Sequence, residues 1–209
     1  MPDSPELAEL LTPGRVAVLT MELQRGVAGD LSVMAPLVAA VAEARVVEHT
    51  AALLDAARAR DISVVHCRAA FRPDRSGSYA NVPMVNRLLE NPDHLTVDTP
   101  PAELIPALGP APGDLDSLRL HGMSPFHGTS LDPLLRSAGV DTVIATGVSL
   151  NVGIPGLVIE ALNHGYHVVL PTDCVVGHPV DYGEAVLQNT LARITHQTRS
   201  DVIVEHWKT

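Results

Sequence analysis

Several polar residues that could do chemistry follow short apolar runs, at the points where buried strands would end. Glu22 follows the run Arg15 to Thr20 (RVAVLT), and a carboxyl group there could act as a proton donor or as a base. Ser149 and Asn151 follow the run Asp141 to Thr146 (DTVIAT). Because the carboxyl ends of parallel strands meet at one edge of a sheet, these side chains are expected to form one site.

Other polar residues near these strand ends are candidates for orienting a substrate. Gln24 lies two residues beyond Glu22, and Arg68 and Arg72 follow the apolar run that ends at Cys67. One guanidinium would suit a carboxylate ligand, although a solvated loop is the commoner use of such an arginine. We also expect His121 to face the site, and Ser149 and Asn151 to bind the substrate. Asn151 has an alternative role as the cap of the helix that follows it.

The two cysteines, Cys67 and Cys174, are expected to be small buried hydrophobic residues rather than nucleophiles. No histidine lies between Arg68 and Asn91, and the ten histidines show no ligand spacing. The sequence therefore predicts neither a metal site nor a cofactor.

The elements that must position these residues alternate between apolar runs and helical stretches, which is typical of a parallel sheet covered by helices. Expected strands are Arg15 to Thr20, Ile62 to Cys67, Asp141 to Thr146, His167 to Leu170 and Asp201 to Glu205. Expected helices are Ala35 to Arg60, Pro83 to Glu90, Pro101 to Leu108, Ser130 to Ala138, Val152 to Asn163 and Val180 to Thr195. The predicted fold class is α/β: a Rossmann-like, three-layer α/β/α sandwich with a mainly parallel sheet of about six strands.

Composition limits the partners. The 209 residues carry a formal charge of −10, which argues against a nucleic-acid or anionic-membrane surface. No signal segment or membrane span is recognisable, so we expect a cytoplasmic, single-domain protein over residues 1–209, with residues 1–14 as an N-terminal extension. The helix expected from Val152 is apolar around most of its circumference, which favours a homodimer or a higher homo-oligomer.

Three segments resemble the isochorismatase-like (cysteine hydrolase) superfamily, and they occur in that family's order. The first is VAVLTMELQ, at residues 16–24, and the second is LHGMSPFHGTSLDPLLRSAGVDTVIATG, at residues 120–147. The third and most specific is GVSLNVGIPGLVIEALNHGYHVVLPTDCV, at residues 147–175. The resemblance implies the same α/β/α fold and hydrolysis of a small molecule.

The resemblance also implies an Asp-Lys-Cys triad, and this chain departs from it at every position. Glu22 falls on the aspartate, Leu120 on the lysine and Gly153 on the nucleophilic cysteine. Thiol-based amide hydrolysis is therefore excluded at that turn, and Gly153 either allows close approach of the backbone or opens space for a ligand. The isochorismatase branch also carries glycine there and protonates a vinyl ether, but it keeps the lysine.

From these departures we predict a hydrolase that acts on a small organic molecule, such as a carboxylate, by acid/base chemistry. Glu22 is its expected catalytic residue, and Gln24, Arg68, Arg72, His121, Ser149, Asn151 and Gly153 are its expected substrate-binding residues. Because Leu120 removes the family's cation, we expect the Glu22 carboxyl to be protonated readily and to serve as an acid. Two alternatives remain: a non-catalytic protein that binds a metabolite or a partner protein, and an oligomeric scaffold in which Leu120 fills the pocket.

Overall fold

The computed structural model describes residues 5–91 and 93–208 and contains a seven-stranded sheet in which every strand pair is parallel. The path order is β3-β2-β1-β4-β5-β7, and β6 pairs with β4. The strands are β1 Val16–Met21, β2 Ser63–Ala69, β3 Leu115–Arg119, β4 Thr142–Val148, β5 His167–Pro171, β6 Val175–Val176 and β7 His196–Thr198. The predicted parallel sheet is confirmed.

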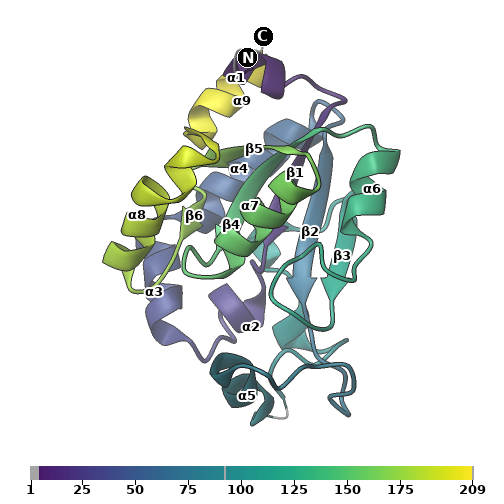
Figure 1. Cartoon of the computed structure of the whole chain (residues 1–209), viewed down its shortest axis with the longest axis vertical. Helices are drawn as coiled ribbons and strands as arrows, with labels where there is room; N and C mark the ends of the chain where they lie inside the picture. The colour runs from purple at the N-terminus through teal and green to yellow at the C-terminus, as the bar shows by residue number, and fades with distance from the viewer. Residues whose placement is uncertain (1–4, 92, 209) are drawn as a thin grey trace.

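Helices cover both faces of the sheet, as predicted (Figure 1). Every residue of β1 and β4 is buried, as expected for strands covered on both sides. One face packs against α3 (Ala35–Glu43), α4 (Val46–Arg58) and α9 (Ser200–Lys208). The other face packs against α6 (Leu131–Ser137) and α7 (Gly153–Asn163).

The part of the expected N-terminal extension that the structure describes belongs to the core. Helix α1 (Leu7–Leu10) lies beside α9 at one end of the molecule (Figure 1). Leu10 and Leu11 are buried, and the Trp207 indole N–H donates a hydrogen bond of 2.9 Å to the Leu11 carbonyl. Residues 5–14 therefore pack on the domain, whereas residues 1–4 lie outside the described part of the chain.

The strand predicted at Asp201 to Glu205 is wrong, because these residues lie in α9. Ile203 and Trp207 are four residues apart and buried, which places both on one helix face. The Asp173 carboxylate accepts hydrogen bonds from the N–H and hydroxyl groups of Ser200 (2.9 and 2.8 Å) at the start of the helix. Contacts distant in sequence thus favour the helix.

The structure differs from the predicted elements in two further ways: one long helix is divided in two, and two edge strands were not predicted. The single helix predicted from Ala35 to Arg60 is divided into α3 and α4 by Arg45, whose φ is 53°. The edge strands β3 and β7 were missed, since LDSLR and HQT lack the apolar runs of buried strands. The remaining helical segments are α2 Arg25–Ala28, α5 Pro83–Leu89, η1 Pro100–Ala102, η2 Pro106–Leu108, α8 Val180–Asn189 and η3 Leu191–Arg193.

The apolar surface of α7, on which the prediction of a homo-oligomer was based, is largely covered within the chain. Ile154, Leu157 and Val158 of α7 are fully buried within the chain itself. Ile159 is the one large hydrophobic residue of this helix that remains exposed. The helix therefore needs no second chain to cover it, and the homo-oligomer stays a prediction without that support.

The strand order places a crevice between the ends of β1 and β4. From β1 the chain builds outward through β2 to β3, and from β4 it builds the opposite way through β5 to β7. Open parallel sheets bind ligands outside the carboxyl ends of strands at such a switch point. Within the described residues, no helix is long and apolar enough to cross a membrane.

Candidate functional site

A chamber of about 700 Å³ opens at this crevice. Glu22, just beyond β1, and Arg119, the last residue of β3, form part of its wall. Ser149, Asn151 and Gly153 line it from the turn between β4 and α7. The carboxyl ends of the strands thus bring together residues that are far apart in the sequence, such as Glu22 and Arg119, which are 97 positions apart.

Glu22 and Arg119 form an ion pair in this wall. The Glu22 backbone has a φ of 52°, and its N–H donates a hydrogen bond of 3.0 Å to the Cys67 carbonyl. Such left-handed geometry costs a non-glycine residue on the order of 1 kcal/mol and is concentrated at functional sites. Arg119 is held in place by a hydrogen bond of 3.0 Å from its Nε to the Gly122 carbonyl.

The predicted loss of the cation near Glu22 is wrong, because Arg119 supplies that cation. The Arg119 side chain is 8% exposed, that of Glu22 is 19% exposed, and Leu120 is not among the residues that line the chamber. Strand β3 ends at Arg119, so the charge lies one residue before the family's lysine position. A shift of one residue reverses the side of an extended chain, which is why Arg119 points into the site. The Glu22 carboxylate therefore has a cationic partner in the chamber wall.

Three buried polar atoms of chamber-lining residues lack a hydrogen-bond partner within the described part of the chain. They are Nη1 of Arg119, Nδ1 of His121 and Oδ1 of Asn151. Buried polar groups in native proteins are nearly always paired. All three residues belong to the chamber wall, so the chamber is where a missing partner could be supplied. The predicted contribution of His121 to the site is consistent with this placement.

The turn that carries the family's cysteine is tightly packed here. A Cβ atom added to Gly153 would lie 2.7 Å from the Val148 carbonyl oxygen, so the backbone comes too close for a side chain. Gly153 also lines the chamber, so both explanations given for this glycine have support. Asn151 does not cap α7: the capping position is Val152, and the Asn151 amide instead donates a hydrogen bond of 2.5 Å to the His178 carbonyl.

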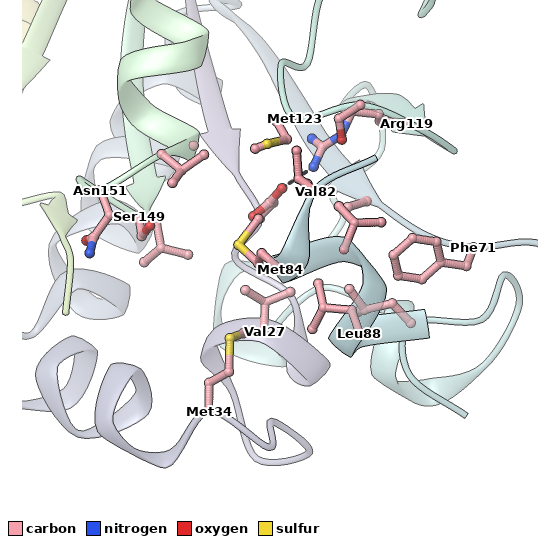
Figure 2. Close-up of a pocket in the computed structure, with 18 of the residues that line it drawn as sticks. Val27, Met34, Phe71, Val82, Met84, Leu88, Arg119, Met123, Ser149 and Asn151 are labelled. Carbon is pink, nitrogen blue, oxygen red and sulfur yellow. Dashed lines mark hydrogen bonds and ion pairs between the residues drawn. The ribbon is translucent and has the colours of Figure 1, made fainter. Parts of the chain in front are cut away.

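The remainder of the chamber wall is largely apolar, and sequence analysis did not identify it. Met84, Val85 and Leu88 of α5 contribute to it, together with Met34 and Phe71. Figure 2 shows Met34 and Leu88 on the side of the chamber away from Arg119, with Met84 between them and Arg119. The spacing of apolar residues in PMVNRLL was the only available signal, because nothing local shows that this helix faces the end of the sheet.

Three predicted substrate-binding residues lie outside the set that lines the chamber, and that prediction is corrected. Gln24 is fully buried: its amide donates to the carbonyls of Ala69 (2.8 Å) and Ala102 (2.9 Å), and its oxygen accepts from the Ala69 N–H (2.7 Å). It joins two backbone segments and has no capacity left for a substrate.

The two arginines are also occupied elsewhere. Arg68 donates two hydrogen bonds to the Asp116 carboxylate, of 2.6 and 2.8 Å, and one to a backbone carbonyl. Arg72 is exposed and donates to the Ser76 carbonyl at 3.1 Å. These hydrogen bonds to a carboxylate and to backbone carbonyls account for the positions of both arginine side chains without a ligand.

Neither cysteine is placed as a nucleophile. Burial raises the pKa of the Cys67 thiol to about 12, and burial likewise raises the pKa of the Cys174 thiol to about 12. The thiolate is the reactive form, so both groups are inert at neutral pH. Within the described residues, no cluster of three or more His, Cys, Asp or Glu side chains is arranged to hold a metal ion, and no chemistry is assigned to one.

Comparison with known proteins gives consistent matches. A sequence profile of the isochorismatase domain matches residues 16–201. A maleamate amidohydrolase of Pseudomonas putida is 31% identical over 145 residues, which cover 68% of this chain and 64% of that protein. An uncharacterized isochorismatase family protein of Bacillus subtilis is 30% identical over 107 residues, covering 51% of this chain and 56% of the relative. The chain thus spans less than two thirds of the length of these curated relatives.

Solved structures match over almost the whole chain. A cysteine hydrolase from Pseudomonas syringae pv. phaseolicola superposes with a TM-score of 0.80 at 25% identity, covering 94% of each chain. An isochorismatase family protein from Desulfovibrio vulgaris superposes with a TM-score of 0.77 at 25% identity, covering 93% of this chain and 98% of the other. The architecture is therefore shared from end to end.

Proposed function

The chain belongs to the isochorismatase family, and from that premise we propose that it hydrolyses a small molecule with water activated by Glu22. The observation that carries this proposal is the Glu22–Arg119 ion pair in the chamber wall. A charged acid/base group with a fixed cationic partner is placed where the fold binds ligands. Gly153 provides no nucleophilic side chain, so water is the nucleophile that the site can use.

The proposed reaction is the hydrolysis of an amide, since relatives of this chain are named maleamate and ureidoacrylate amidohydrolases. Glu22 accepts a proton from a water molecule, and the resulting hydroxide adds to the carbonyl carbon. The same proton is then transferred from Glu22 to the leaving nitrogen as the C–N bond breaks. The products are a carboxylic acid and an amine, and no side chain becomes covalently modified.

Arg119 has two roles in this scheme. Its Nη2 side holds Glu22 in position, and its buried Nη1 has no partner within the described residues. In the proposed scheme that N–H group donates a hydrogen bond to the carbonyl oxygen, which becomes negatively charged as water adds. Fixed donors aimed at developing charge commonly contribute a hundredfold or more to the rate, on the order of 3 kcal/mol each.

A second candidate is a non-catalytic protein that binds a metabolite in the same chamber. The tight packing of Gly153 against the Val148 carbonyl favours it, because the turn has lost the space that a nucleophile needs. The scaffold hypothesis has less support, since it expects Leu120 to fill the chamber and Leu120 does not line it.

Hydrolysis of a panel of amides, esters and enol ethers by three proteins tests the proposal. We expect the wild type and the double variant Cys67→Ala/Cys174→Ala to hydrolyse the same compound, and Glu22→Gln to lose about a hundredfold or more in rate. Loss of activity in the folded cysteine-free protein would contradict the proposal. Binding of panel compounds without any turnover would favour the binding protein instead.

A further inference from the structure

We infer that the ligand of this chamber is an uncharged carbonyl compound with an extended hydrocarbon body, and not a small carboxylate. The inference concerns the site of the proposed function and rests on that proposal only for the location. It replaces the carboxylate that the sequence suggested. Three features support it: the charge balance of the chamber, the atom that Arg119 leaves unpaired, and the apolar wall.

The charge balance argues against an anionic ligand. Among the described residues that line the chamber, Glu22 and Arg119 are the only Asp, Glu, Lys or Arg side chains, and they neutralise each other in an ion pair. A ligand carboxylate on Arg119 would share one guanidinium with the Glu22 carboxylate. Two carboxylates at one site repel each other, and one of them resists ionisation. Arg68, which could have offered a second cation, is paired with Asp116.

The unpaired atom of Arg119 specifies the chemistry of the ligand's head group. The guanidinium uses Nη2 for Glu22 and Nε for the Gly122 carbonyl, while Nη1 has no partner within the described residues. The side chain is 8% exposed, so an unpaired N–H here is costly. The neutral carbonyl oxygen of an amide or ester satisfies this donor without adding charge beside Glu22.

The apolar wall specifies the body of the ligand. A volume of about 700 Å³ is large for a head group alone and lies within the range of about 300–1,000 Å³ typical of drug-sized ligands. Figure 2 shows Val27, Met34 and Leu88 around the part of the chamber away from Arg119, and Met84 between that part and Arg119. Helix α5 has no fully buried residue, and Met84 is 48% exposed. A hydrocarbon chain in the chamber would cover this surface, which the protein's own packing leaves uncovered.

Calorimetric titration of the wild-type protein at pH 7 with butanamide, hexanamide, octanamide and octanoate tests the inference. We expect the affinity of the amides to rise about fourfold for each added methylene group, the value for full transfer of a methylene out of water. Octanamide should bind at least about tenfold more tightly than octanoate, which is ionised at this pH. Equal or tighter binding of octanoate, or affinity that does not depend on chain length, would overturn the inference.

Two variants test the causes separately. Glu22→Gln removes the competing carboxylate, so octanoate should bind at least about tenfold more tightly to this variant than to the wild type. Leu88→Asn should weaken octanamide about tenfold or more and butanamide much less. Ile159→Asn is its matched control, because Ile159 is an exposed apolar residue outside the chamber, and octanamide should bind it as it binds the wild type. If octanoate binding does not respond to Glu22→Gln, the charge argument is wrong.

The results separate this inference from the proposed hydrolysis. Binding of octanamide in the expected series without any turnover of amides or esters would support the inference and contradict the hydrolase. Turnover of a short charged amide such as maleamate, with no measurable binding of octanamide, would support the hydrolase and overturn the inference.

Discussion

Two carboxylate–arginine pairs lie near the sheet, and they differ in how completely their polar atoms are paired. Glu22 and Arg119 line the chamber, and Arg119 retains a buried N–H without a partner in the described residues. Asp114 and Arg58 lie at the start of β3 and the end of α4, outside the set that lines the chamber. The first pair is incomplete and lies in the chamber wall, whereas the second is fully paired and lies outside that wall.

The Asp114 network shows what a structural polar cluster looks like in this protein. The carboxylate accepts hydrogen bonds from Arg58 (2.7 Å), the Ala111 N–H (2.9 Å) and His66 Nε2 (3.1 Å). Burial alone would raise the pKa of the Asp114 carboxyl, but these hydrogen bonds outweigh it and hold the pKa below its usual range. An ionised carboxylate only accepts, so Nε2 of His66 carries a proton, and Nδ1 of the neutral ring accepts from the Thr20 hydroxyl at 2.8 Å.

The comparison teaches that charge and burial alone do not identify a site in this fold. Both clusters combine a carboxylate that is largely shielded from solvent with an arginine, and the one with the histidine and threonine resembles a catalytic relay more closely. Thr20 is 1% exposed, however, and His66 is 2% exposed, so no substrate reaches either. The incomplete pairing of Arg119 distinguishes the candidate site.

The largest expected change in stability comes from Arg58→Met. This substitution leaves Asp114, which is 5% exposed, without its cation, and removes the donor to the Leu108 and Gly109 carbonyls. We expect the free energy of unfolding to fall by about 3–5 kcal/mol, with ligand binding by the folded protein retained. Urea unfolding measures this, and an unchanged unfolding free energy would remove the contrast between the two pairs.

Arg119→Met should lower the unfolding free energy less than Arg58→Met does, and it should impair ligand binding and turnover more. Glu22 is 19% exposed, so solvent in the chamber can replace part of the lost interaction, and we expect a loss of about 1–2 kcal/mol. Octanamide binding and any turnover should be lost because both use this guanidinium. A variant that unfolds as readily as Arg58→Met while its folded fraction still binds octanamide would assign Arg119 a structural role.

His66→Gln should lower the unfolding free energy at neutral pH less than Arg58→Met does, and it should also change the pH dependence of that free energy. Burial lowers the pKa of His66, although Asp114 opposes this, and burial also lowers the pKa of His94 and His196. The unfolded chain therefore binds more protons than the folded chain below about pH 6.5. As the pH is lowered through this range, the unfolding free energy decreases by at most about 1.4 kcal/mol per pH unit for each histidine.

The variant removes one of these three contributions, so unfolding free energies measured between pH 7 and pH 5 should show a shallower slope than in the wild type. At pH 7 we expect a loss of about 1–2 kcal/mol, since Asp114 and Thr20 each lose a partner. The contribution of Asp114 belongs to a more acidic range, because its lowered pKa means that it is lost only as the pH falls below about 4. An unchanged slope above pH 5 would show that His66 does not titrate as described.

The smallest expected effect on function comes from replacing the thiols. Cys67→Ala and Cys174→Ala should each change the turnover rate by no more than about twofold, because thiols with a pKa of about 12 are protonated at neutral pH. Steady-state rates measure this, and unfolding by urea controls for the small cavities that the substitutions leave. A specific loss of rate in a folded variant would return the nucleophile to a cysteine.

The central sheet could be predicted from the sequence because β1, β2, β4 and β5 are apolar runs buried on both sides. The edge strand β3 could not, because its sequence LDSLR is not an apolar run and includes Asp116 and Arg119. A strand was wrongly predicted at Asp201 to Glu205 because the five-residue pattern DVIVE is compatible with either a strand or a helix. The packing of Trp207 against the N-terminal segment decides for the helix, and five residues cannot reveal that contact.

The candidate site was predictable where it follows the buried strands, and less so elsewhere. Glu22, Ser149, Asn151 and Gly153 were placed by strand ends and by the family pattern, and all line the chamber. Arg119 was missed because the family pattern points to Leu120, and the sequence does not show that Arg119, the last residue of β3, lines the chamber. The wall from α5 depends on how a long connection folds back over the sheet, and local spacing does not determine that.

The most direct test of this account replaces the two carboxylates in parallel, with turnover and unfolding free energy measured for each protein. Glu22→Gln and Asp114→Asn both remove one charge and keep the size of the side chain. The account predicts that Glu22→Gln lowers the turnover rate about a hundredfold or more while unfolding free energy changes by less than about 1 kcal/mol. Asp114→Asn should lower the unfolding free energy by about 2–3 kcal/mol and leave the rate of the folded protein nearly unchanged. Equal losses of rate in both variants, or a normal rate in Glu22→Gln, would contradict the assignment of the Glu22–Arg119 pair as the functional site.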